Sequence, residues 1–220
     1  MSGRLSFQNE IEKLNIELIK MGTLIENSIE NVIIAFKNKD INLAKEIIKK
    51  DREIDDMEKT IEGHCLSLIL RQQPVAKDLR IVSTALKMVT DIERIGDHCS
   101  DIAEIIIRLE KNHIFEDFAY ILDMASLAKK MVNGSIESFV ESNTELTKKI
   151  ISIDDEMDSL FNKVKEKVIE MLKKSNECSD MCIDFLMMAK YFERIGDHAE
   201  NICEWVEFNE TGEYKNSRIL

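Results

Sequence analysis

The sequence predicts an all-α protein built from two tandem, pseudo-symmetric antiparallel three-helix bundles, and three observations support this class. The 220-residue chain has one proline and seven glycines, too few turn-forming residues for an all-β fold. The six-residue segment ERIGDH occurs at 93–98 and again at 193–198, which indicates a duplicated unit. Apolar residues also recur at spacings of three and four, the period of helices packed in a bundle.

The first unit is predicted to span residues 1–111. Its helices are expected at 8–37, 41–72 and 75–111. Asp40 can cap the second helix through its carboxylate, and Pro74 ends that helix because the residue before a proline is disfavoured in the helical region. The third helix carries the most regular apolar stripe, formed by Ile81, Ala85, Met88, Ile92, Ile95, Cys99, Ile102, Ile106 and Leu109.

The second unit is predicted to span residues 112–208 and to repeat this plan. Its helices are expected at 114–142, 144–174 and 178–208. Residues 209–220 are polar, contain Gly212 and show no apolar period, so we expect a disordered tail there.

Composition limits the function classes. The formal net charge of −12 argues against nucleic-acid binding and against electrostatic adhesion to anionic lipid. No apolar stretch reaches the length of a membrane-spanning helix, and the first residues lack the apolar region of a signal peptide. The odd number of cysteines, five, is typical of a reducing compartment. We therefore expect a soluble, cytoplasmic protein.

The repeated segment places acidic residues four positions apart, and such residues share one face of a helix. The row consists of Glu93, Asp97 and Asp101 in the first unit, and of Glu193, Asp197 and Asn201 in the second. Helical periodicity places this row nearly opposite the apolar stripe. We therefore expect the carboxylates to face solvent or a groove between helices, as an exposed surface and not an internal active site.

Two interpretations of the row remain open, a solvated helix face and a metal site. Like charges four apart cost a few tenths of a kcal/mol, and a glycine inside a helix costs about 1 kcal/mol relative to alanine. Gly96 therefore needs a reason, such as the close approach of another backbone. Carboxylate oxygens suit magnesium, manganese, calcium or iron. Further ligands can come from the predicted second helices, namely Asp51, Asp55, Asp154 and Asp158.

The histidines and arginines give weaker signals. His98 and His198 lie one position past the aspartates and turn away from the row, so they can be ligands, partner contacts or surface residues. His64 falls on the apolar side of its helix and is interpreted as a hydrogen-bonded boundary residue. Arg94 and Arg194 are expected to pair with nearby carboxylates.

Enzyme signatures are missing from the sequence. It contains neither a phosphate-binding GxxxxGK[ST] loop nor a GxSxG nucleophile elbow. A di-iron carboxylate oxidase carries Glu-x-x-His on two helices, whereas here only Glu110 and His113 have that spacing. Cys178 and Cys182 could hold a soft metal but have no counterparts in the first unit, so we interpret them as incidental. A non-enzyme is favoured, with a di-iron enzyme and a purely structural scaffold as alternatives.

The two ERIGDH segments, together with residues 71–80 (RQQPVAKDLR), resemble the PhoU family of phosphate-signalling regulators, over residues 8–208. The resemblance implies a non-enzymatic cytoplasmic adaptor, commonly a homodimer. It would link the ATPase of a phosphate ABC transporter to a sensor histidine kinase at the inner face of the membrane. It would also restrain phosphate uptake and the phosphate-starvation response when phosphate is plentiful.

The resemblance also implies metal binding at the acidic motifs, with iron, zinc, magnesium or manganese as candidates. The ligands carried over by position are Glu93, Asp97, Asp101, Glu193 and Asp197. Asp51, Asp55, Asp154 and Asp158 follow as second-rank candidates. Asn201 offers only a neutral oxygen where the first unit has Asp101, so two sites of unequal strength are expected.

Overall fold

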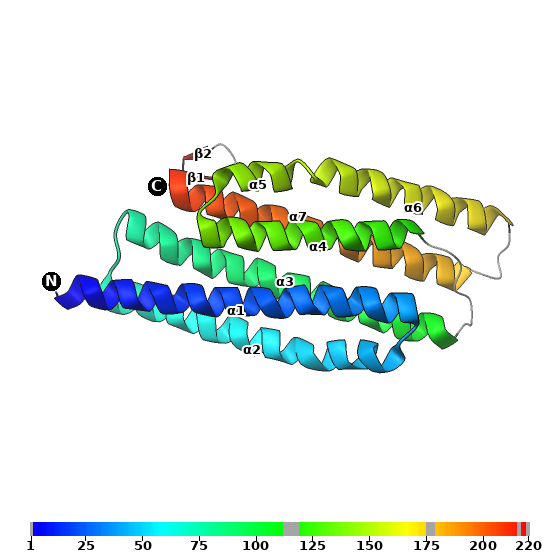
Figure 1. The fold of residues 1–220 in the computed structure, drawn as a ribbon, viewed down its shortest axis with the longest axis horizontal. Helices are drawn as coiled ribbons and strands as arrows, with labels where there is room; N and C mark the ends of the chain where they lie inside the picture. The colour runs from blue at the N-terminus through cyan, green and yellow to red at the C-terminus, as the bar shows by residue number, and fades with distance from the viewer. Residues whose placement is uncertain (1, 112–118, 175–178, 215–216, 219–220) are drawn as a thin grey trace.

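The computed structural model describes residues 2–111, 119–174, 179–214 and 217–218, and these form two helical bundles that lie side by side (Figure 1). The first bundle contains α1 (Ser2–Asn38), α2 (Ile41–Gln72) and α3 (Lys77–Lys111). The second contains α4 (Ala119–Glu141), α5 (Thr144–Ile151), α6 (Asp154–Lys174) and α7 (Ser179–Thr211). Two short strands, β1 (Glu213–Tyr214) and β2 (Ser217–Arg218), follow α7. The predicted all-α class with two repeated bundles is confirmed.

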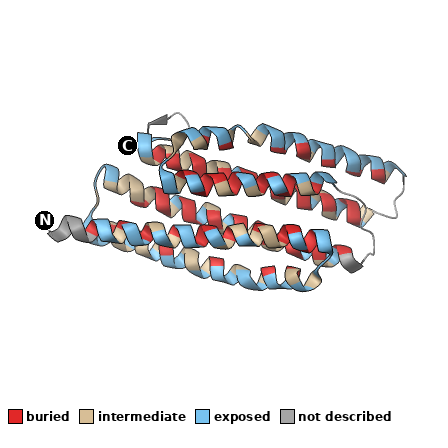
Figure 2. Cartoon of the chain, viewed as in Figure 1, coloured by how far each residue is buried: buried red, intermediate tan, exposed pale blue. Residues whose placement is uncertain are grey.

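The two bundles join mainly through α3 and α7, with α1 against α4 as a second contact. Buried residues gather on the helix faces that turn toward the centre of the molecule (Figure 2). The predicted stripe of α3 is buried from Ala85 to Leu109, and only Ile81 is half-buried. The helix also buries Val82, Val89 and Ala103, because it packs against α2 on one side and α7 on another.

The connection between α1 and α2 and the end of α2 are as predicted. The Asp40 carboxylate accepts hydrogen bonds from the backbone N–H groups of Asn42 and Leu43, both at 3.0 Å, and so caps α2. At the other end, Gln73 adopts a left-handed conformation with φ of 46° and donates its N–H to the Ile69 carbonyl. Pro74 follows and prevents the helix from continuing.

The single helix predicted over 144–174 is wrong, because the chain breaks between α5 and α6. Backbone hydrogen bonds from Ser152 to Lys148 and from Ile153 to Ile150 close a turn there. Asp154, Asp155 and Glu156 then form the first turn of α6, where negative charge is favoured by the helix dipole. The short α5 also packs closely on α4, since a Cβ at Gly134 would lie 2.3 Å from Ile150 Cδ1.

The disordered tail predicted over 209–220 is also wrong for the residues that the structure describes. Helix α7 continues to Thr211, and Gly212, with φ of 80°, turns the chain back into the antiparallel β1–β2 pair. The ring of Tyr214 stacks on Trp205 with 4.1 Å between centroids. A hydrophobic stacking contact, which local polarity did not reveal, therefore orders this segment.

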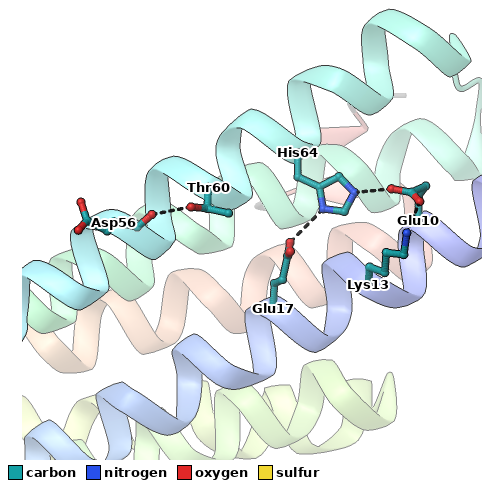
Figure 3. Close-up of polar contacts among 6 residues, drawn as sticks. All are labelled: Glu10, Lys13, Glu17, Asp56, Thr60 and His64. Atoms are coloured by element: carbon teal, nitrogen blue, oxygen red, sulfur yellow. Dashed lines mark hydrogen bonds and ion pairs between the residues drawn. The ribbon is translucent and has the colours of Figure 1, made fainter.

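A histidine joins α1 to α2 near the end of the first bundle where α1 begins and α2 ends (Figure 3). His64 Nδ1 lies 2.9 Å from Glu17 Oε2, and Nε2 lies 3.1 Å from Glu10 Oε2. Both ring nitrogens can donate at once only in the imidazolium form. His64 is thus a hydrogen-bonded boundary residue, as predicted. Within the described ranges, no helix is long and apolar enough to cross a membrane.

Candidate metal centre

Four acidic residues meet in the groove between α2 and α3, and we call them the first acidic cluster: Asp51, Asp55, Glu93 and Asp97. Asp51 and Asp55 lie one helical turn apart on α2, and α3 packs against that face. One carboxylate oxygen from each of Asp51, Asp55 and Asp97 lies within 4.8 Å of the other two. The expectation that Asp51 and Asp55 can reach the acidic row of α3 is therefore met.

The row is less exposed than predicted. The Glu93 side chain is only 14% exposed and that of Asp97 is 35% exposed, because α2 covers this side of α3. The expected groove exists, but the expectation of an exposed surface opposite the core is wrong for Glu93. A residue next to the buried Ile92 lies on the flank of the stripe, and the neighbouring helix decides whether that flank is covered.

Gly96 allows this close packing. A Cβ at this position would lie 3.1 Å from Ile54 Cδ1 and 3.2 Å from Asp51 Oδ1. The predicted close approach therefore comes from the side chains of α2, and not from its backbone. In the second unit the equivalent Gly196 faces the flexible side chain of Met131, whose Sδ would be 3.3 Å away.

The electrostatics of the cluster favour a bound cation. Burial, followed by the charges of Asp97 and Glu58, raises the pKa of Glu93 to about 7. Glu93 Oε2 is buried and accepts no hydrogen bond from the part of the chain that the structure describes. As predicted, Arg94 pairs with the row, with Nη1 2.8 Å from Asp97 Oδ2 and Nε 3.5 Å from Glu93 Oε2. One guanidinium leaves the cluster with excess negative charge.

Asp51 is also affected by the excess negative charge of the first acidic cluster. Burial raises its pKa to about 6, with further increases from the charges of Asp97 and Asp55, while a hydrogen bond with Ser100 opposes them. A bound cation would remove the repulsion that raises these pKa values. The donors are all carboxylate oxygens, a set that suits hard cations such as magnesium, manganese or iron. The residues present therefore fit a metal ion.

Asp101, the third member of the predicted row, is placed differently. Its carboxylate accepts a hydrogen bond from Tyr191 of α7, and its Oδ2 lies 3.6 Å from His98 Nδ1. Burial and the nearby Asp97 raise the pKa of Asp101. Asp101 therefore bridges to the other bundle and is not one of the three residues whose oxygens converge.

The second unit brings Asp154 and Asp158 of α6 close to Glu193 and Asp197 of α7, and we call these four residues the second acidic cluster. Burial raises the pKa of Asp154, followed by the charges of Asp158 and Asp197. Across the described ranges, however, no three ligand oxygens of this cluster converge as those of the first cluster do. The predicted second site thus has its residues assembled but lacks the compact arrangement of the first.

Asn201 does not belong to the second acidic cluster. Its Nδ2 donates to Asp91 Oδ1 at 3.2 Å, and His198 Nδ1 lies 2.8 Å from the same oxygen. Asp91 is on α3, so both contacts cross between the bundles. The prediction of Asn201 as a metal ligand is therefore not supported by its placement.

Sequence reasoning missed this polar network between α3 and α7. His98 is only 7% exposed, with its ring centroid 5.4 Å from Tyr191 and 5.6 Å from His198. Burial, followed by the charge of His198, lowers the pKa of His98 to about 4. His98 is therefore not a surface residue. A usable signal existed, because Asp91 and Tyr191 occupy equivalent positions of the repeat, two helical turns before His98 and His198 and therefore on the same helix face.

The remaining candidates add little to the site. Cys182 is buried in the core of the second bundle. Cys178 and His113 lie outside the described residues, so their predicted roles remain predictions.

Comparison with known proteins identifies the repeat. The family model of the PhoU domain matches the chain twice, over residues 18–106 and 121–206, once in each bundle. The chain belongs to the PhoU family. This agrees with the resemblance inferred from the ERIGDH segments and the turn at residues 71–80.

Relatives in the PhoU family match along almost the whole chain. A Clostridium acetobutylicum protein named "Phosphate-specific transport system accessory protein PhoU homolog" is 39% identical, with 95% of this chain and 96% of that protein covered. A Thermotoga maritima homolog is 32% identical, with 96% and 92% covered. The crystal structure of PhoU from Pseudomonas aeruginosa superimposes with a TM-score of 0.91 at 27% identity, covering 94% of this chain and all of that one. A Streptococcus pneumoniae structure gives 0.87 at 26% identity, with 94% and 98% covered.

Proposed function

We propose that this protein is an accessory, regulatory protein of a phosphate transport system. Membership of the PhoU family supports the proposal, as do the names of its relatives, which are accessory proteins of phosphate-specific transport. The similar Streptococcus pneumoniae structure is that of a "phosphate transport system regulatory protein". Coverage above 90% of both chains in these comparisons favours a shared role of the whole protein over a shared domain.

In this role the protein acts at the cytoplasmic face of the membrane as a non-enzymatic homodimer. It couples the ATPase subunit of a phosphate ABC transporter to a sensor histidine kinase and restrains uptake when phosphate is plentiful. The sequence motifs support this mechanism through their resemblance to the family. The alternative di-iron enzyme is disfavoured because its carboxylates belong in a bundle core, whereas the first acidic cluster lies in a groove between α2 and α3.

We also assign metal binding to the first acidic cluster. The observation that carries this assignment is the convergence of Asp51, Asp55 and Asp97 from two helices. A bound magnesium, manganese, iron or zinc ion would neutralise carboxylates that burial holds together and would tie α2 to α3. The metal therefore provides a means to stiffen the first bundle for partner binding.

Two variants on α2 test the metal assignment. Asp55→Asn removes a converging carboxylate, whereas Asp56→Asn is a matched control because Asp56 is 81% exposed and pairs only weakly with Lys59, at 3.6 Å. Metal bound per chain, measured by elemental analysis after dialysis against Mn²⁺, is expected to fall in the first variant and to remain in the second. Equal metal content in both variants would remove Asp55 from the site.

A gene deletion tests the regulatory role. Deletion is expected to derepress phosphate-starvation genes in phosphate-replete cells, and wild-type protein and Asp56→Asn are expected to restore repression. Affinity capture from the same cells, followed by mass spectrometry, should recover transporter or kinase subunits. Unchanged expression after deletion would reject the role in this host. Loss of repression with Asp55→Asn would connect the metal centre to signalling.

A further inference from the structure

The two acidic clusters differ at two positions that the duplication aligns. The ERIGDH repeats align Thr90 of α3 with Lys190 of α7, each three residues before the first acid of its segment. The aspartate pairs of α2 and α6 align Glu58 with Phe161. The first unit therefore has a neutral residue and an extra carboxylate where the second has an ammonium group and an aromatic ring.

Lys190 uses its ammonium group inside the second acidic cluster. Its Nζ donates to both carboxylate oxygens of Glu193 and lies 5.6 Å from the centroid of the Phe161 ring. The Glu193 side chain is only 13% exposed, so this ion pair lies in a partly desolvated groove. A charge-assisted contact of this kind is stronger than one on an open surface, and the aromatic face adds a cation–π contribution.

The first acidic cluster has no such counter-ion at the equivalent position. Thr90 is exposed and carries no charge. Glu58 instead adds negative charge near Glu93 and helps to raise its pKa. An arginine follows the first acid in both units, as Arg94 and Arg194, so it does not account for the difference.

We infer that Lys190 is a built-in counter-ion that takes the place of a metal in the second acidic cluster and confines metal loading to the first. The inference rests on the proposed metal binding at the first acidic cluster. A cation entering the second cluster would have to displace an ammonium group that already satisfies both oxygens of Glu193. It would also have to separate that group from Phe161, so its affinity falls. The pseudo-symmetric protein is thereby made asymmetric in its metal content.

Reciprocal substitutions test this, because each unit provides the control for the other. Lys190→Thr gives the second cluster the residue of the first, and Thr90→Lys does the reverse at an exposed position. The probe is Mn²⁺, with bound metal counted by equilibrium dialysis and elemental analysis. Lys190→Thr is expected to add a second class of Mn²⁺ site, which Asp158→Asn then removes. Thr90→Lys is expected to weaken Mn²⁺ binding at the first cluster by about tenfold or more.

Thermal unfolding in excess chelator gives a readout without metal. Lys190→Thr is expected to lower the midpoint, because it leaves the carboxylates of the second cluster unneutralised, while Thr90→Lys should raise it. The inference is overturned if Lys190→Thr binds no more Mn²⁺ than wild type, or if wild type already fills both clusters. A wild-type protein that binds no Mn²⁺ would instead refute the metal role of the first cluster. Even in that case, a gain of bound Mn²⁺ in Lys190→Thr would support the counter-ion role of Lys190, and the absence of such a gain would overturn that role.

Discussion

Glu93 provides the sharpest test of the electrostatics of the first acidic cluster. Its pKa rises from an ordinary value of 4.5 to about 7 in the folded protein. The native state therefore holds the Glu93 proton more tightly than the unfolded chain does. The stability gained from this proton is complete below about pH 4.5 and is lost as the pH rises through 7. Glutamine mimics the protonated side chain, so Glu93→Gln should escape this loss.

The magnitude follows from the shift. A rise of this size corresponds to a limit of about 3 kcal/mol at 1.36 kcal/mol per unit. Water reaches part of the site, and Arg94 lies 3.5 Å away, so screening lowers the effect. We expect Glu93→Gln to increase the free energy of unfolding by about 1–2 kcal/mol near pH 8 and by about 0.5 kcal/mol or less near pH 4.5.

Urea unfolding with chelator present, followed by circular dichroism at both pH values, measures the effect. The matched control is Glu193→Gln, which removes the partner of Lys190 and should give no gain near pH 8. An equal effect of Glu93→Gln at both pH values would refute the reasoning, as would a loss of stability near pH 8. The pKa of Asp51 is also raised, but Asp51 contributes the same pH dependence of stability to the wild type and to the variant.

Further predictions concern local packing. Asp40→Ala removes two capping hydrogen bonds and should cost about 1 kcal/mol in urea unfolding, whereas no change would show that the cap is not needed. Gly196→Ala should gain up to about 1 kcal/mol of helix stability because its Cβ meets only the flexible side chains of Met131 and Met157, while Gly96→Ala should gain less or lose stability because its Cβ meets Ile54 and Asp51 of α2. The reverse order would contradict the packing described above. Tyr214→Ala should lower stability by about 1 kcal/mol and change the fluorescence of Trp205, the only tryptophan.

The proposed metal loading would give the two-bundle arrangement a functional consequence. If only the first acidic cluster loads metal, the two bundles respond differently to the same ion despite their common fold. Helix α3 carries part of that cluster and also forms the contact with α7 through Asp91, His198 and Tyr191. A change in how α2 and α3 pack is therefore positioned to reach the second bundle.

The sequence alone determined the architecture and most of the candidate site. The repeated ERIGDH segment established the duplication, and the stripe of α3 identified its core face, because helical periodicity fixes the direction of each residue around its own axis. The same rule placed Asp51, Asp55 and Asp97 on faces that could meet. It also placed the cap at Asp40 and the end of α2 before Pro74.

The tertiary structure decided what lies beside each helix. Periodicity does not say which neighbouring helix covers the flank of a given helix. It therefore could not show that α2 buries Glu93, or that Asp101 forms a hydrogen bond with Tyr191 of α7. It could not separate α5 from α6 or predict that Tyr214 stacks on Trp205, because these depend on contacts between distant residues. The difference between the two clusters has the same origin. The substitution of Thr90 by Lys190 is visible in the sequence, but only the packing of α6 on α7 brings that ammonium group between Glu193 and Phe161.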